Sequence, residues 1–151
     1  DWIIHPYYIK EYNNRWFLFG LNEENHSIHN IALDRIEEIE QVNKEYIPTD
    51  IDFERYLDDV VGVSVSASEK LTIRLQFSEH RFPYVLTKAL HRSQRVVDLD
   101  NRIVEINVIP NNELEALILS YGKDVEVLSP PEYKNQIREV IRESYEHYLP
   151  V

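Results

Sequence analysis

The chain has 151 residues, of which 43% are hydrophobic, enough for one or two small domains with cores of their own. A net charge of −11 argues against general binding to nucleic acid or anionic lipid. No cysteine is present, and neither a bilayer-spanning apolar run nor a signal peptide is recognisable, so disulfides and thiolate metal sites are excluded and a cytoplasmic location is expected.

Residues 1–47 are predicted to form β structure. Residues 16–21 are almost all apolar, which is typical of a strand buried on both faces. A polar turn is predicted at 22–25, and residues 27–33 are expected to pair back as the second arm of a hairpin. The β pattern is expected to continue to the end of this region.

A short amphipathic helix is predicted after Pro48, because apolar residues recur at spacings of three and four. These residues are Phe53, Tyr56, Leu57 and Val60. Gly62 stands where a helix stop is expected. We therefore place a helical linker at 49–68, between a first domain at 1–48 and a second at 69–151.

The second half shows a clear succession of predicted strands and helices. Strands are predicted at 71–77, 95–99, 103–109 and 125–128, and helices at 83–90, at 112–121 and after Pro131. Asn112 and Glu115 resemble a capping box at the start of the second of these helices. The order β-α-β-β-α-β-α predicts a ferredoxin-like α/β sandwich, with helices on an antiparallel sheet.

The charge is unevenly spread along the chain. Between residues 70 and 102, seven lysines and arginines stand against three acidic residues. This stretch is either a local anion site within an acidic chain or an ordinary set of solvated charges. The chain begins at Asp1 and contains no methionine, so we expect it to be a piece of a longer protein.

Several short motifs follow one another in a recognisable order. They are His5–Tyr8, Asn14–Gly20, Ala32–Ile36, His91–Gln94, Ile118–Gly122 and Val125–Pro131. The first three resemble the WYL domain of bacterial transcriptional regulators, and the last three resemble the C-terminal extension that follows it. The resemblance covers nearly the whole chain.

The resemblance implies an α+β fold. Residues 1–48 would be a partial Sm/SH3-like small β-barrel, truncated at its N-terminus, and residues 69–151 the ferredoxin-like extension. It also implies a helix-turn-helix domain N-terminal to this chain, which would bind double-stranded DNA; residues 1–151 supply no such domain.

In the family, the strand motif and its arginines resemble an anion-binding face for nucleotides or single-stranded nucleic acid. Guanidinium groups pair with phosphates, and aromatic rings stack on bases. Here Trp16 matches, whereas Phe17 replaces a tyrosine and His29 replaces an arginine. Ala32 stands at a position that is usually basic, so two phosphate contacts are weakened or lost. The expected ligand-binding residues are Tyr7, Arg15, Trp16, Phe17, His29, Arg35, His91 and Arg92.

Each of these residues also has a purely structural interpretation. Trp16 is either a core residue or a stacking platform, and Arg35 either pairs with Asp34 or a loop carbonyl or contacts a ligand. The loop from His91 to Gln94 is either a binding loop or a hydrogen-bonded turn. His26 and His29, three apart in a strand, face opposite sides and are not expected to share a metal.

The function expected from the sequence is ligand sensing and oligomerisation in a regulator of transcription, acting as a homodimer without membrane contact. The alternative is a pure dimerisation or protein-interaction module with a decayed ligand site. No cofactor, metal or catalytic group is expected, because the acidic pairs are adjacent rather than facing and there is no glycine-rich phosphate loop. The chain is therefore not expected to be an enzyme.

Overall fold

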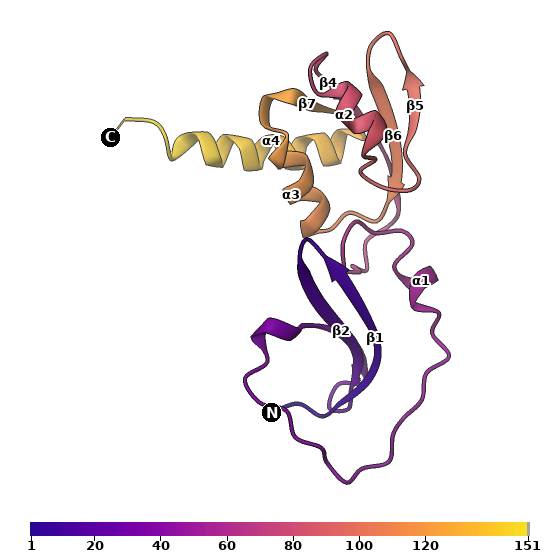
Figure 1. Cartoon of the computed structure of the whole chain (residues 1–151). Helices are drawn as coiled ribbons and strands as arrows, with labels where there is room; N and C mark the ends of the chain where they lie inside the picture. The colour runs from indigo at the N-terminus through magenta and orange to yellow at the C-terminus, as the bar shows by residue number, and fades with distance from the viewer. Residues whose placement is uncertain (151) are drawn as a thin grey trace. The chain divides into compact units, whose positions relative to one another are not determined.

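The computed structural model describes residues 1–150, which form two compact units (Figure 1). The first unit comprises residues 1–58 and 62–64, and the second comprises residues 59–61 and everything from Val65 onward. The family domains that we place on either side of a linker at 49–68 stay a prediction. No helix within residues 1–150 has the length and apolar character needed to cross a bilayer.

The first unit is built on a three-stranded antiparallel sheet, formed by β1 (Ile4–Tyr12), β2 (Arg15–Asn22) and β3 (Ser27–Ala32) in chain order. Asn13 and Asn14 join β1 to β2, with positive φ angles of 53° and 61°. Two left-handed residues give the hairpin turn that matches the twist of the strands, and asparagine tolerates this conformation well. The predicted hairpin of β2 and β3 is confirmed.

The core of the first unit lies on one face of this sheet. Phe19 is 2% exposed, and its ring lies 6.3 Å from that of Tyr8 and 5.7 Å from that of Phe53, between centroids. Phe53 opens α1 (Phe53–Tyr56), which Asp52 caps by accepting a backbone hydrogen bond. A helix is therefore present where the apolar spacing predicts one, but it is a single turn that ends at Tyr56. Leu57 and Val60 lie beyond it, and the helix stop predicted at Gly62 is wrong.

The β structure does not continue beyond Ala32. The single turn η1 (Leu33–Arg35) follows β3, and residues 36–52 contain neither helix nor strand. This segment is joined to β1 through side chains rather than by a ladder, because Tyr46 Oη donates to Pro6 O and the Ile47 amide donates to His5 Nδ1. The described residues thus form an open sheet and no closed barrel.

The second unit alternates strands and helices. Its elements are β4 (Leu71–Phe77), α2 (Phe82–Thr87), β5 (Arg95–Asp98), β6 (Ile103–Val108), α3 (Asn112–Ser120), the single turn η2 (Gly122–Asp124), β7 (Val125–Ser129) and α4 (Pro131–Glu146). The sheet is antiparallel throughout, with the strand order β5-β6-β4-β7. The predicted element order is the observed one, and the class is α and β with antiparallel sheets.

The sheet of the second unit is buried on one face and polar on the other. Ile73 and Leu75 of β4 are fully buried, as are Val104 and Ile106 of β6. Thr72 and Arg74 alternate with the buried residues of β4; they point to the opposite face and are exposed. This is the two-residue alternation that the sequence of β4 predicts.

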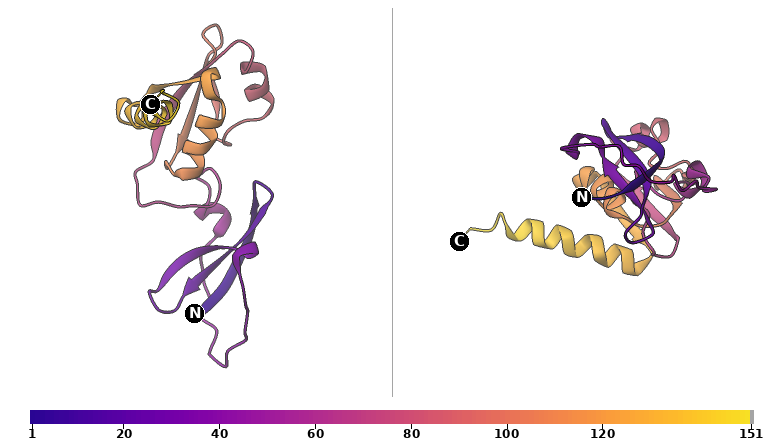
Figure 2. Two further views of the ribbon diagram at one scale, coloured as in Figure 1. Left: turned by 90° about the vertical axis from the view of Figure 1, so that its left-hand side faces the viewer. Right: turned by 90° about the horizontal axis from the view of Figure 1, so that it is seen from below.

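The two longer helices of this unit begin where the sequence suggests, with one shift. The capping residue of α3 is Asn111 rather than Asn112: its side chain accepts a hydrogen bond from the Leu114 amide at 2.8 Å. The cap falls one residue earlier because only Asn111 has the extended backbone that a cap requires. Two prolines, Pro130 and Pro131, introduce α4, which runs out past the sheet (Figures 1 and 2).

Candidate functional site

The sheet of the first unit divides the predicted ligand-binding residues between its two faces. Successive side chains in a strand point to opposite sides. Arg15 and Phe17 therefore share the face of Phe19, which carries the core, while Trp16 lies on the other face. The structure does not bring Arg15 and Trp16 to one surface.

Trp16 is an exposed residue of an open apolar face, and the interpretation as a core residue is wrong. Its exposed fraction is 55%, and that of Ile9 on the same face is 52%. His29 also points to this side, opposite Gly20 in the ladder. The ring of Trp2 meets the His29 ring edge-on at 5.1 Å between centroids. The indole of Trp16 is thus an accessible large ring on this sheet face.

The two arginines near this sheet differ in their partners. Arg15 Nε lies 3.0 Å from Asp34 Oδ2, so its charge is compensated. Arg35, in the turn η1, is exposed. Neither pairing that the sequence suggested for Arg35 is found within residues 1–150, since Asp34 contacts Arg15 instead. Its guanidinium is therefore available to an external anion.

Tyr7 lies elsewhere, at an irregularity of β1. The register between β1 and β2 shifts between Pro6 and Tyr8, which turns Tyr7 out of the regular ladder. Its hydroxyl donates to Ile47 O at 2.9 Å. Burial, and secondarily the neighbouring phenol of Tyr46, raises the pKa of Tyr7, so the side chain is neutral at physiological pH.

The loop from His91 to Gln94, in the second unit, is a hydrogen-bonded turn. Ser93 Oγ lies 2.7 Å from His91 Nδ1 and accepts from the Asn107 amide at 2.9 Å. The Gln94 side chain accepts from the Leu90 amide and donates to a carbonyl of α2. These bonds order the entry into β5. Ligand binding by His91 and Arg92 stays a prediction.

A buried carboxylate joins two arginines across three strands of the second unit. Glu105 of β6 is 1% exposed, and its two oxygens accept hydrogen bonds from Arg74 of β4 and Arg95 of β5. The hydrogen bonds from Arg74 and then Arg95 lower the pKa of Glu105. The cluster carries one net positive charge, on the polar face of the sheet, and its two arginines belong to the basic stretch 70–102.

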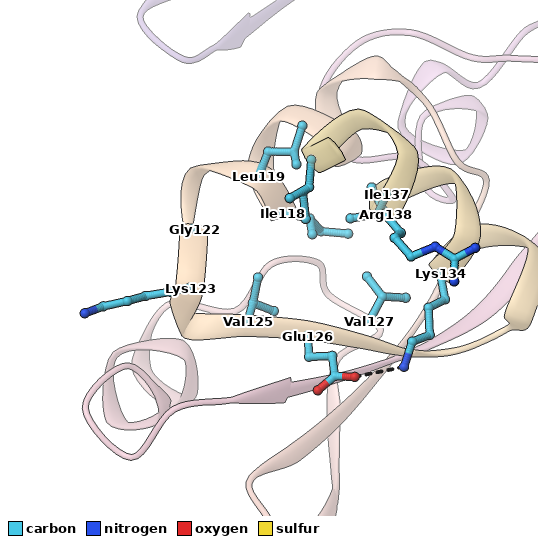
Figure 3. Close-up of a pocket in the computed structure, with 11 residues that line it drawn as sticks. Ile118, Leu119, Gly122, Lys123, Val125, Glu126, Val127, Lys134, Ile137 and Arg138 are labelled. Carbon is cyan, nitrogen blue, oxygen red and sulfur yellow. Dashed lines mark hydrogen bonds and ion pairs between the residues drawn. The ribbon is translucent and has the colours of Figure 1, made fainter. Parts of the chain in front are cut away.

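An apolar groove of about 630 Å³ lies between α3, β7 and α4 (Figure 3). Ile118 and Ile137 face Val125 and Val127 across it. Charged side chains stand at its edge, where Lys134 Nζ contacts Glu126 Oε1 at 2.8 Å. Polar groups at the edge and aliphatic walls suit an apolar side chain or segment better than a nucleotide.

A family model, the WCX domain, matches residues 69–145, just over half of the chain. The chain belongs to the WCX family. The match confirms the resemblance of the second half to the C-terminal extension of WYL regulators. Both the groove and the Glu105 cluster lie inside the WCX domain.

Among solved structures, the chain is similar to proteasome accessory factor B/C (PafBC) of Arthrobacter aurescens, at 12% identity and a TM-score of 0.40. The similarity covers 97% of this chain and 22% of the PafBC chain. No curated protein matches the chain.

Three features of the molecule were not predicted from the sequence. Glu105 is one charged residue inside an apolar strand, and its partners lie 10 and 31 residues away. The groove of the WCX domain needs the packing of three elements. A third feature, a group of aromatic rings around Tyr46, depends on a segment without regular structure. Within residues 1–150, no group of three or more metal-ligating side chains is found.

Proposed function

We propose that the chain is the effector-sensing region of a bacterial helix-turn-helix transcriptional regulator, and that its first unit binds a nucleotide or a short single-stranded nucleic acid. One observation carries the proposal: Trp16, at the centre of the WYL-like motif, stands exposed on an open sheet face. Membership of the WCX family supports the regulatory context, since this domain is the C-terminal companion of WYL domains.

The chemistry of this face, together with Arg35 in the turn that follows β3, suits a base and a phosphate. Stacking of a base on an aromatic ring contributes about 1–3 kcal/mol. The exposed guanidinium of Arg35 can form charge-assisted hydrogen bonds with a phosphate. His29 shares the face of Trp16 and supplies one ring nitrogen where the family has a guanidinium. We therefore expect binding that is weaker than in relatives with the full set of arginines.

In the proposed architecture, the sheet of the first unit corresponds to three strands of a small Sm/SH3-like barrel. The second unit corresponds to a ferredoxin-like sandwich, and its antiparallel strand order β5-β6-β4-β7 supports this interpretation. The DNA contacts of the regulator belong to its helix-turn-helix domain. The chain itself senses a ligand and catalyses no reaction, in a homodimeric regulator located in the cytoplasm.

A titration tests the proposal. Nucleotides and short single-stranded DNA are added to the whole chain, and binding is measured by calorimetry for the wild type, Arg35→Ala and Trp16→Ala. We expect each substitution to weaken binding at least about fivefold. Arg55→Gln, an exposed arginine of α1, is the matched control and should bind like the wild type. Equal, negligible binding by all four proteins would end the sensor proposal.

A second candidate, a pure dimerisation module, is favoured by the apolar stripe of α4. Tyr133 and Ile137 of this stripe are buried, but Ile141 and Tyr145, at the same four-residue spacing, are 52% and 63% exposed. Apolar surface in such a row indicates an interaction surface.

Light scattering distinguishes this candidate. A dimer that dissociates in the Ile141→Glu, Tyr145→Glu double variant would support it, whereas a wild-type chain that stays monomeric at high concentration would exclude it.

A further inference from the structure

A second pocket, which lies in the first unit, has no part in the proposed binding of nucleic acid. It has a volume of about 520 Å³ and lies between the irregularity of β1 and the segment that leads into α1. Its walls include four aromatic rings and two carboxylates: Tyr7, Tyr8, Tyr46, Phe53, Asp52 and Glu54. We call this site the tyrosine pocket.

The rings of the tyrosine pocket present faces in more than one direction. Tyr7 and Tyr46 meet at 77°, with centroids 6.1 Å apart, so they form two walls of a corner. Tyr8 is stacked parallel to Phe53 at 5.4 Å. Phe53 is 5% exposed and belongs to the core, whereas Tyr46 is 54% exposed. The pocket therefore has a rigid base and an accessible side.

The hydroxyl groups of this corner are already engaged. Tyr7 Oη donates to Ile47 O and Tyr46 Oη donates to Pro6 O, which ties β1 to the segment before α1 from both sides. These bonds hold the rings in place. A ligand would accordingly meet the π faces of the rings rather than their hydroxyls.

The charge of the tyrosine pocket is negative. Asp52 and Glu54 are its charged residues, and no lysine or arginine belongs to its lining. Burial, and secondarily the nearby Tyr46, raises the pKa of Tyr7, so this phenol contributes no charge at neutral pH. Carboxylates repel a nucleotide or any other anion but attract a cation.

Aromatic faces beside carboxylates are the chemistry that recognises weakly hydrated organic cations. Metal ions need converging oxygen or nitrogen ligands instead, and within residues 1–150 no group of three such side chains is found. We propose that the tyrosine pocket binds a quaternary ammonium or methylated ammonium group, held by the faces of Tyr7 and Tyr46 and by the carboxylates of Asp52 and Glu54.

Two probes of equal shape test the charge requirement on the unaltered chain. Choline carries a trimethylammonium group, and 3,3-dimethyl-1-butanol carries a neutral tert-butyl group of the same size. Each is titrated while the tyrosine ring resonances are followed by NMR. We expect saturable shifts with choline and at least about tenfold weaker binding of the alcohol. No saturable shift with choline, or equal binding of both probes, would overturn the proposal.

Two variants of one residue then test the ring. Tyr46→Phe keeps the aromatic face and should bind choline within about twofold of the wild type, whereas Tyr46→Leu should lose about tenfold. Both variants lack the hydrogen bond to Pro6, so any effect of that bond on folding is shared. Glu54→Gln should weaken choline binding about threefold. If Tyr46→Leu bound choline as tightly as Tyr46→Phe, a role for the ring would be contradicted.

Discussion

Gly20, at the end of the WYL-like motif Asn14–Gly20, lies close against β1. A Cβ at this position would lie 2.5 Å from Ile4 Cγ2 and 2.7 Å from the carbonyl oxygen of His5. The side chain of Ile4 could turn away, but the backbone oxygen could not without displacing β1. The glycine of the motif is therefore required by the space between two strands.

We predict that Gly20→Ala lowers the free energy of unfolding of the first unit by about 1–3 kcal/mol. Urea unfolding followed by tryptophan fluorescence measures this, because both tryptophans belong to the first unit. Gly122→Ala is the control: nothing lies within 4 Å of the added Cβ, and the strain of its φ of +54° falls in the second unit, which holds no tryptophan. It should leave the tryptophan transition unchanged, and the same result for Gly20→Ala would show that the strands can separate freely.

Tyr133 carries a buried polar group, its hydroxyl. Its ring is 2% exposed, and within residues 1–150 its buried hydroxyl has no hydrogen bond. Burial, and to a lesser extent Glu115, raises the pKa of this phenol.

We predict that Tyr133→Phe leaves the free energy of unfolding unchanged or raises it by up to about 1 kcal/mol, because an unsatisfied hydroxyl is removed. The helical circular dichroism of the second unit in urea measures it, and a loss above about 1 kcal/mol would mean that the hydroxyl has a partner.

At the scale of elements, Glu105 joins β4, β6 and β5 in a way that depends on pH. Arg74 and Arg95 lower the pKa of Glu105 in the folded chain below its ordinary value of 4.5. The unfolded chain therefore takes up a proton at higher pH than the folded one. The stabilisation is fully present above about pH 4.5 and is lost as the pH falls through the folded value.

We predict that Glu105→Gln unfolds with a free energy about 1–2 kcal/mol lower at neutral pH, and that this difference from the wild type shrinks below pH 4.5. Urea unfolding across the acidic range, followed by circular dichroism, measures both curves. Glu126→Gln, an exposed glutamate of β7, is the control and should run parallel to the wild type. A constant difference down to the lowest pH would contradict the pairing.

The apolar stripe of α4 gives a prediction that compares two isoleucines of the same helix. Ile137 is 5% exposed and Ile141 is 52% exposed, one turn apart. Ile137→Ala should therefore cost about 2–4 kcal/mol of unfolding free energy, and Ile141→Ala less than about 1 kcal/mol when the chain is dilute. Similar losses at both positions, measured by urea unfolding, would mean that Ile141 is covered in solution.

Local pattern was sufficient for the elements of the second unit. The alternation of β4 and the spacing of α3 and α4 are properties of neighbouring residues, so most helices and strands could be placed within one or two residues. The helix predicted at 83–90 is the exception, since α2 ends at Thr87. The β structure predicted for residues 36–47 is wrong, because apolar residues of this segment such as Ile39, 80% exposed, make no ladder. Its position depends on side-chain bonds between residues 40 or more apart in sequence, at Tyr7 and Tyr46.

The candidate site shows the same limit. That Arg15 and Trp16 face opposite sides follows from the two-residue period of a strand, and the sequence alone could have excluded a face shared by both. Exposure of Trp16 could not be predicted, since an apolar run such as residues 16–21 is also typical of a buried strand. The tyrosine pocket depends on a bulge in β1, and no residue pattern in the sequence predicts this bulge.

At the scale of the whole molecule, the net charge of −11 restricts any contact with nucleic acid to a small area. The exposed guanidinium of Arg35 and the exposed indole of Trp16 meet this condition, because one guanidinium and one ring can hold a single nucleotide without an extended basic surface. The cation-binding tyrosine pocket belongs to the same unit but uses the opposite charge. One small unit would thus recognise two ligands of opposite sign through separate residues.

Fluorescence from Trp16 alone tests the central claim most directly. In a Trp2→Phe background Trp16 is the only tryptophan, so any stacking of a base on it is read without interference. Adding short single-stranded DNA should quench this fluorescence saturably, duplex DNA of the same length should not, and Arg35→Ala should shift the midpoint at least about fivefold. Fluorescence that stays constant through the whole titration would contradict the account.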